Sequence, residues 1–253
     1  MLKILNTRPG IRGTLLGNLL QQEDFQVFNF PVQIIKSIDL KLNEVIDLVE
    51  KKSHWVFVSP IAVDILFKQL KQLNFSKNKL DNVIFYAVGE GTKQALDNHI
   101  KDKTIIYPKN NHGAKALFET IQSFDLKNQS FFIFRGEAGS DLLCKLLKEA
   151  KACVKEIICY QRKLNPELES EVFNQFILNT KLDAIIFTSF EPLRLLYRDY
   201  ANAISKKHAL ITVTNKEMES WALDKGFQNI LFLEKIDNSS IVQSVNSHFK
   251  NLF

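Results

Sequence analysis

The sequence is poor in cysteine and lacks both a long apolar run and a dense block of positive charge. No stretch approaches the roughly 20 apolar residues of a membrane-spanning helix, so we expect no membrane association. The chain begins with the strand-like segment MLKIL and no signal-peptide pattern, which predicts a cytoplasmic protein. A net charge of +5 without a Lys/Arg cluster disfavours nucleic acid and favours a small polyanion as ligand.

Sequence signals for metal and nucleotide chemistry are also missing. The three cysteines, Cys144, Cys153 and Cys159, show no Cys-x-x-Cys spacing and lie in apolar patterns. This predicts buried free thiols; the alternative is a catalytic thiol, although no motif places a histidine to activate it. The five histidines are scattered, so no metal site is expected. Without a Walker loop, a Gly-x-Ser-x-Gly elbow or a full dinucleotide fingerprint, a nucleotide-dependent transferase is disfavoured.

One segment of the chain occurs twice. Ile4–Lys36 and Phe131–Lys163 align without gaps, so that Arg8 falls on Arg135 and four leucines of one copy fall on four of the other. Each copy reads as a strand, a turn with Arg and Gly, an amphipathic helix and a second strand. The repeat therefore predicts a duplicated structural unit.

Ten short apolar strands alternate with helices along the chain, a pattern typical of parallel sheets. The predicted strands are 1–6, 27–30, 54–58, 83–88, 104–107, two within 131–160, 183–187, 209–213 and 229–233. The predicted helices include 12–22, 40–51, 113–123, 166–179, 216–225 and one that begins at 239, with others after the turns at 59–60, 89–92, 136 and 188–189. Five plus five strands predict an α/β fold of two flavodoxin-like, doubly wound domains.

The order of the strands leaves two domain arrangements open. They come as two, three, two and three, and 32–35 reads as an extended connector. The domains are either consecutive halves, or the first pair joins the last triplet while the middle of the chain forms the other domain.

Small and hydroxylated residues follow the predicted strands, where ligands of open parallel sheets bind. The candidates are Ser59, Gly89, Thr92, Gly136, Thr188 and Ser189. Such turns present free N–H groups and the positive end of a helix to carboxylates or phosphates. The alternative is that Ser59, Thr92 and Ser189 only cap helices.

Three larger side chains are also candidates. Arg8 and Arg135 follow the first strands of the two repeat copies and suit a forked grip on carboxylates, with a structural ion pair as the alternative. Tyr160 ends the second copy's last strand, where its phenol suits hydrogen-bond donation or general acid catalysis; an interface tyrosine is the alternative.

A set of short motifs, in this order and at this spacing, resembles one family. They are Thr7-Arg8-Pro9, FVSPIAV (Phe57–Val63), YAVGEGT (Tyr86–Thr92), FRGEAGSDLL (Phe134–Leu143), CYQRK (Cys159–Lys163) and IIFTSFEPLRLL (Ile185–Leu196). Over almost its whole length, the chain resembles the uroporphyrinogen-III synthases.

The resemblance implies the nested domain arrangement. Residues 1–33 and 164–253 would form one domain and 34–163 the other, joined by a two-stranded connector near 32–35 and 159–163. The active site would lie in the cleft between the domains.

The resemblance also implies the reaction. The substrate would be hydroxymethylbilane, a linear tetrapyrrole with eight carboxylates, which loses its terminal hydroxyl as water and closes with inversion of ring D. Tyr160 would assist hydroxyl departure, and Arg8, Ser59, Gly89, Thr92, Arg135, Gly136, Thr188 and Ser189 would bind substrate. The resemblance implies no cofactor, and we expect a transient contact with the preceding pathway enzyme. With no long apolar seam evident, a monomer is expected. The alternative function is a two-lobed binding or sensor protein for a small polyanion.

Overall fold

The computed structural model describes residues 1–40, 49, 52–204 and 208–250. The chain divides into two compact units, which we call unit 1 (Met1–Ile35 with Lys163–Phe253) and unit 2 (Lys36–Arg162). Most of the helix predicted over 40–51 lies outside the described residues. Among those described, no helix is both long and apolar enough to span a bilayer.

Unit 1 contains a five-stranded sheet in the order β11-β10-β9-β1-β2, with all neighbours parallel. Its elements are β1 (Lys3–Asn6), α1 (Gly10–Gln22), β2 (Gln26–Asn29), a 3-10 turn η2 (Pro166–Glu169), α7 (Glu171–Asn179), β9 (Ala184–Ile186), α8 (Phe190–Tyr200), β10 (Leu210–Val213), α9 (Lys216–Asp224), β11 (Ile230–Phe232) and α10 (Asn238–Lys250). Taken in chain order, its strands lie as second, first, third, fourth and fifth, the flavodoxin order.

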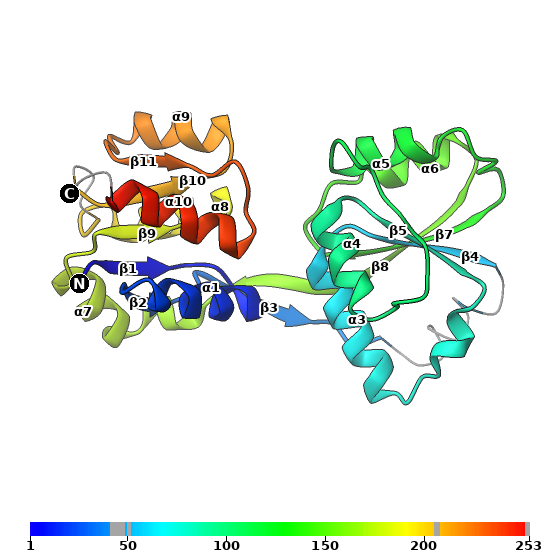
Figure 1. Ribbon diagram of the computed structural model, residues 1–253, viewed down its shortest axis with the longest axis horizontal. Helices are drawn as coiled ribbons and strands as arrows, with labels where there is room; N and C mark the ends of the chain where they lie inside the picture. Colours follow the sequence, from blue (N-terminus) through cyan, green and yellow to red (C-terminus); the bar gives the residue numbers. More distant parts are fainter. Residues whose placement is uncertain (41–48, 50–51, 205–207, 251–253) are drawn as a thin grey trace. The chain divides into compact units, whose positions relative to one another are not determined.

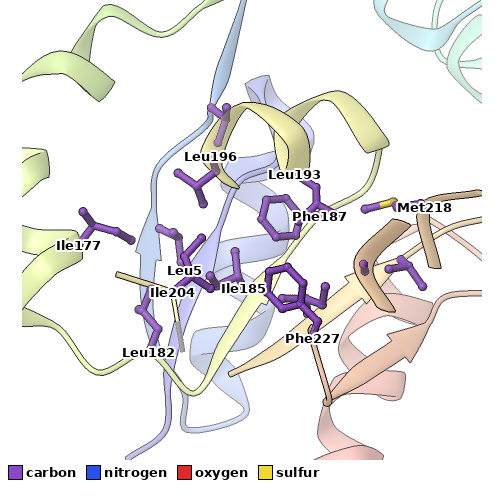
Figure 2. Close-up of a cluster of buried hydrophobic side chains, with 14 of the residues drawn as sticks. Leu5, Ile177, Leu182, Ile185, Phe187, Leu193, Leu196, Ile204, Met218 and Phe227 are labelled. Carbon is purple, nitrogen blue, oxygen red and sulfur yellow. The ribbon is translucent and has the colours of Figure 1, made fainter. Parts of the chain in front are cut away.

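Both faces of the unit 1 sheet are covered, because successive strand residues point to opposite sides. Ile4 packs with Leu16 and Leu20 of α1 and with apolar residues of α10. Leu5 packs on the other face with α7, α8 and α9, a cluster that Figure 2 shows in close-up. Fully burying each such side chain stabilises the fold by about 1.5–3 kcal/mol.

Unit 2 contains the parallel strands β8-β7-β4-β5-β6. Its elements are β4 (Ser53–Phe57), α3 (Pro60–Gln72), a 3-10 turn η1 (Lys77–Leu80), β5 (Val83–Ala87), α4 (Glu90–Asp97), β6 (Ile105–Ile106), α5 (Ala114–Ile121), β7 (Ser130–Gly136), α6 (Leu142–Glu149) and β8 (Cys153–Leu164). One face packs against α5 and α6. Stacked aromatic rings, such as Phe57 on Phe134 at 4.7 Å, fill the core on the opposite face.

The repeat seen in the sequence is confirmed by strand register. In unit 1, Ile4 pairs with Val27, and in unit 2 the aligned residues Phe131 and Val154 pair in the same way. The third, fourth and fifth strands follow this pair in unit 1, whereas in unit 2 their counterparts β4, β5 and β6 precede it. The two units therefore share one strand order but start from different strands.

Two strands connect the units. β3 (Gln33–Ser37) lies beside the carboxyl-terminal part of β8 in the sheet order β3-β8-β7-β4-β5-β6 (Figure 1). The Ile38 amide donates to the Cys159 carbonyl at 2.8 Å, and the Asn165 amide donates to the Val32 carbonyl at 3.0 Å. Since residue numbers rise on one strand and fall on the other, the pair is antiparallel. The predicted fold class, including the two-stranded connector, is confirmed.

One predicted helix is interrupted. The segment 166–179 was expected as a single helix, but it forms η2 and then α7. Ser170 between them has an extended backbone, and its side chain accepts a hydrogen bond from the Phe173 amide at 3.2 Å. Serine at this position starts a new helix by capping it.

The prediction of three buried thiols is wrong for one of them. Cys144 and Cys159 are buried, but Cys153 is exposed. Cys153 is the first residue of β8, and β3 covers only the later part of that strand. The start of β8 is therefore a sheet edge, where an apolar pattern does not ensure burial.

Candidate functional site

Polar residues gather after strands that lie side by side. In a doubly wound sheet, ligands bind at the carboxyl ends of the two central strands from which the chain winds in opposite directions. These strands are β1 and β9 in unit 1, and β7 and β4 in unit 2. Arg8, Thr188 and Ser189 follow the first pair; Arg135, Gly136 and Ser59 end or follow the second.

Ser59 is held at the start of α3. Its backbone is extended (φ −160°, ψ 153°), and Pro60 follows at the first helical position, where a missing N–H costs nothing. The Ser59 hydroxyl accepts a hydrogen bond from the Ala62 amide at 3.2 Å. The predicted cap is thus present, and the same hydroxyl also has a second partner.

That second partner is Tyr160. The hydroxyl oxygens of Tyr160 and Ser59 lie 3.1 Å apart, so one donates to the other. Tyr160 is only 4% exposed, and the guanidinium of Arg162 lies 5.8 Å from the centre of its ring. The structure therefore brings Ser59, Gly136 and Tyr160 together at the end of the central strands of unit 2.

Arg135 is engaged within unit 2. Its guanidinium forms ion pairs with Asp141, at 2.8 Å, and with Glu156, and it also donates to the Gly139 carbonyl. Burial lowers the pKa of Arg135, but hydrogen bonds and charge attraction from the two carboxylates raise it more, so the net shift is upward. The same contacts lower the pKa of Asp141. This geometry favours the structural alternative for Arg135.

Arg8 has different partners. Its guanidinium donates to the Ile236 carbonyl at 2.8 Å and to the side-chain oxygen of Asn238 at 2.7 Å. No described carboxylate forms an ion pair with it. Burial, with a smaller contribution from the charge of Arg12, lowers the pKa of Arg8 to about 10. Arg8 thus ties the end of β1 to the start of α10, although it aligns with Arg135.

Of the two hydroxyl residues after β9, Ser189 is more open than Ser59. Ser189 is exposed, Thr188 is half-buried, and Ser189 makes no side-chain cap bond with described residues. Pro192 occupies the third position of α8, so the N–H that Ser59 finds on Ala62 does not exist here. The predicted capping role therefore fails for Ser189, whereas its predicted role in substrate binding stays a prediction.

Gly89 and Thr92 lie at the start of α4 in unit 2. Gly89 precedes the helix in an extended conformation, and both residues are buried. A methyl group on Gly89 would lie 3.1 Å from the Cβ of His112. The roles of Gly89 and Thr92 as substrate ligands also stay predictions.

The alternative of a catalytic thiol finds no support at Cys159. Burial raises the pKa of the Cys159 thiol to about 12, against a smaller effect of the Arg135 backbone amide. A thiol acts as a nucleophile or metal ligand through its thiolate, which is scarce at neutral pH in this case. Among the described residues, no three His, Cys, Asp or Glu side chains gather as a metal site requires.

Sequence reasoning missed the partners that hold the two arginines. The sequence gives an indirect signal for Glu156, because the repeat predicts that β7 and β8 pair. In that pairing Glu156 lies opposite Ile133, and Arg135, two residues further along β7, points to the same face of the sheet. Asn238 gives no such signal, since it is remote in sequence from Arg8. Thr7 was noted as part of the Thr7-Arg8-Pro9 motif, without a structural role, and its hydroxyl donates to the Ile186 carbonyl at 2.7 Å and links β1 to β9.

The fold and these residues define a class: a two-unit α/β protein whose strand ends carry hydroxyl and amide groups suited to an anionic ligand. A family model described as uroporphyrinogen-III synthase HemD matches residues 16–243. The chain belongs to this family, as the resemblance implied.

Individual relatives agree with the family. The chain is 24% identical over 255 residues to uroporphyrinogen-III synthase of Escherichia coli (strain K12), covering 96% of this chain and 100% of that protein. It is 26% identical over 168 residues to the Proteus mirabilis synthase, covering 64% of this chain and 80% of the relative.

Solved structures agree at the level of the fold. A mutant uroporphyrinogen III synthase from Thermus thermophilus matches with a TM-score of 0.61 at 15% identity, covering 99% of this chain and 100% of that one. The synthetase from Helicobacter pylori 26695 matches with a TM-score of 0.60 at 16% identity, covering 98% and 100%. Membership of the family brings the activity, uroporphyrinogen-III synthesis, a hydro-lyase reaction of porphyrin biosynthesis, and implies hydroxymethylbilane as substrate.

Proposed function

We propose that the chain closes hydroxymethylbilane into uroporphyrinogen III, with Tyr160 assisting the loss of water. The C–O bond of the terminal hydroxymethyl group breaks, and the hydroxyl leaves with a proton as water. The substituted carbon of ring D then bonds to the methylene carbon that the hydroxyl left, which gives a spiro intermediate. The original bond between that ring carbon and its bridge breaks and re-forms at the free carbon of ring D, which loses a proton, so that the macrocycle closes with ring D inverted. The pairing of Tyr160 with Ser59 at the carboxyl end of the central strands carries this proposal, since ligands of such sheets bind there.

The role of Tyr160 follows from what a phenol can do there. Its O–H can donate to the departing hydroxyl while its oxygen accepts from Ser59, whose own oxygen is held by the Ala62 amide. Such a chain of hydrogen bonds restricts where the phenol points. General acid assistance of this kind contributes about 10²- to 10⁴-fold in rate.

Most of the catalysis would be positional, because the unaided substrate closes without inversion to the type I isomer. Holding the chain so that the substituted carbon of ring D attacks requires a grip on the substrate's eight carboxylates. We assign that grip to the strand-end groups of Gly89, Thr92, Gly136, Thr188 and Ser189. Arg8 would contribute its charge, since its partners are a carbonyl and an amide oxygen. Arg135 would act by holding the end of β7, since its charge is paired with two carboxylates.

The experiment that tests the function is a direct assay. The purified chain is given hydroxymethylbilane, the product is oxidised to the porphyrin, and the type III to type I ratio is measured. We expect type III in large excess, against type I in a control without protein. A product that stays type I would refute the activity. Tight binding without turnover would instead favour the alternative of a binding or sensor protein.

The remaining expectations stay predictions. They are the domain limits 1–33 with 164–253 and 34–163, the active-site cleft between the domains, the monomeric state, the cytoplasmic location, independence from a cofactor and the contact with the preceding pathway enzyme. Catalysis by the chain alone, after dialysis against a chelator, would support the expectation that no cofactor takes part.

A further inference from the structure

Gly136 lies against the ring of Tyr160. A methyl group on Gly136 would lie 2.7 Å from both Cε2 and Cζ of Tyr160 and 3.1 Å from its hydroxyl oxygen. Unbonded carbon atoms approach no closer than about 3.5 Å without repulsion. The φ angle of Gly136 is not positive, so alanine would fit the backbone. The contact with Tyr160, and not a turn, is therefore what calls for glycine.

A β-bulge brings Tyr160 to that contact. Along β7 and β8 the register is regular up to Arg135 opposite Ile158, and then shifts so that Gly136 lies opposite Tyr160. Cys159 is the extra residue of β8. Without it, the alternation of strand side chains would place Tyr160 on the face that Arg135 and Glu156 share. The bulge turns Tyr160 to the opposite face, over Gly136.

Unit 1 has no copy of this arrangement. In the repeat, Gly136 aligns with Pro9 and Tyr160 aligns with Gln33. The counterpart strands β1 and β2 pair in regular register from Lys3 to Asn6. Ser189 aligns with Ser59, but the residue aligned with Tyr160 offers no phenol. The bulge, the glycine and the tyrosine thus occur together in unit 2 alone among the described residues.

We propose that Gly136 is a positioning residue for the reaction: its missing side chain lets the ring of Tyr160 lie across the end of β7, so that the phenol meets Ser59. The bulge at Cys159 turns the Tyr160 ring toward Gly136, and the missing side chain of Gly136 leaves room for that ring. This inference rests on the proposed role of Tyr160. This positioning role acts through the phenol, and it is separate from the grip on substrate carboxylates assigned to Gly136.

The test is a cycle of Gly136→Ala and Tyr160→Phe. Gly136→Ala displaces the phenol, since the atoms it meets are the movable end of the ring, and kcat should fall about 10- to 100-fold with KM changed less than threefold. In the Tyr160→Phe background the same substitution should lower kcat no further. An unchanged kcat for Gly136→Ala, or a full additional loss in the Tyr160→Phe background, would overturn the inference.

The outcomes separate this inference from the proposed function. If Tyr160→Phe itself leaves kcat unchanged, the role of Tyr160 fails and the inference fails with it. If Tyr160→Phe slows turnover while Gly136→Ala does not, only the inference fails. A crystal structure of Gly136→Ala adds a readout without substrate: the Tyr160–Ser59 oxygen separation should exceed 3.5 Å, against 3.1 Å in the parent.

A folding control covers the case in which Gly136→Ala does not fold. The double variant Gly136→Ala with Tyr160→Ala removes the ring that the new methyl group meets. Recovery of a folded protein in the double variant would support the contact as the reason for glycine. If Gly136→Ala destabilises the Tyr160→Ala protein as much as it destabilises the parent, the contact is not the reason for glycine.

Discussion

The two units share a strand order and a repeated sequence, but their aligned arginines and serines make different contacts. Arg135 is paired with two carboxylates, whereas the aligned Arg8 holds a carbonyl and an amide and no described carboxylate. Ser59 caps its helix and meets Tyr160, while the aligned Ser189 does neither with the described residues. The aligned arginines and serines keep the same positions in the two units, but the residues that contact them differ.

This difference shows that alignment of the two repeat copies predicts the position of a residue in the fold better than it predicts the contacts that the residue makes. The place of a residue follows from strand register, which the apolar pattern of both copies determines. Its role depends on partners that come from other elements, such as α10 for Arg8 and β8 for Ser59. Among the described residues, the hydrogen-bonded pair of Ser59 and Tyr160 belongs to unit 2, and experiments that compare matched residues can test how far the two units differ.

The largest effect is expected for Tyr160→Phe in unit 2. Removing the phenol O–H should lower kcat by about 100-fold or more, because a general acid contributes on that scale. The matched control is Tyr200→Phe in unit 1, which removes hydroxyl contacts to Leu168 and Asn174. It should cost about 1 kcal/mol of stability and leave kcat unchanged. Equal kcat values for the two variants would remove Tyr160 from the mechanism. Steady-state assays with urea unfolding measure both quantities.

The next effect compares the two arginines. Arg135→Met should lower the free energy of unfolding by about 2–3 kcal/mol, because it leaves Asp141 and Glu156 without their cation; their partial exposure limits the loss. Arg8→Met should cost only about 1 kcal/mol, since it loses two hydrogen bonds but no ion pair and relieves the burial of a charge. Urea unfolding curves give the comparison. A greater loss for Arg8→Met would show that the ion pairs of Arg135 contribute little.

Much of the fold could be predicted because it depends on local apolar patterns. Strands such as 83–87 and 210–213 and helices such as 216–224 lie within a residue or two of their predicted limits. The interruption at Ser170 was missed because serine is tolerated inside a helix as well as at its start. Cys153 was misjudged because the apolar pattern cannot tell a central strand position from an edge that β3 leaves uncovered.

The sequence predicted where the residues of the candidate site lie along the strands, but not which of them contact one another. Strand ends pointed to Ser59, Gly136 and Tyr160 separately, and the structure brings them together. The bulge at Cys159 decides this, and no local signal marks a bulge because it depends on how two strands pair. Arg8 and Arg135 were treated as equivalent because the sequence shows their alignment and not their partners.

A smaller effect compares the two serines. Ser59→Ala should lower the free energy of unfolding by about 1 kcal/mol, because the Ala62 amide loses its acceptor. Ser189→Ala should change it by less than about 0.5 kcal/mol, since Pro192 has no N–H to offer and the serine is exposed. Thermal unfolding of the two single variants is sufficient. Equal losses would indicate that Ser189 caps α8 through another amide.

The smallest effect concerns His54 of unit 2, where unit 1 has the aligned residue Ala184. The His54 ring is hydrogen-bonded to the Tyr86 hydroxyl at 2.8 Å and to Gln129 at 3.3 Å. Burial lowers the pKa of His54 below its usual 6.5; the bond to Gln129 opposes this shift, and the charge of Lys52 adds to it. The unfolded chain therefore binds the proton first, and stability is present above pH 6.5 and lost as pH falls from there toward the lower folded pKa.

Between pH 7.5 and 6, one such group changes the free energy of unfolding by less than about 1 kcal/mol. His54→Gln keeps polar atoms near Tyr86 but cannot take up a proton, so its unfolding free energy should vary less over this range than that of the parent. Urea unfolding at both pH values measures the difference between the proteins and cancels other titrating groups. Parallel pH dependence in the two proteins would mean that His54 carries its proton equally well in the folded chain, and that its burial beside Tyr86 does not distinguish unit 2 from unit 1.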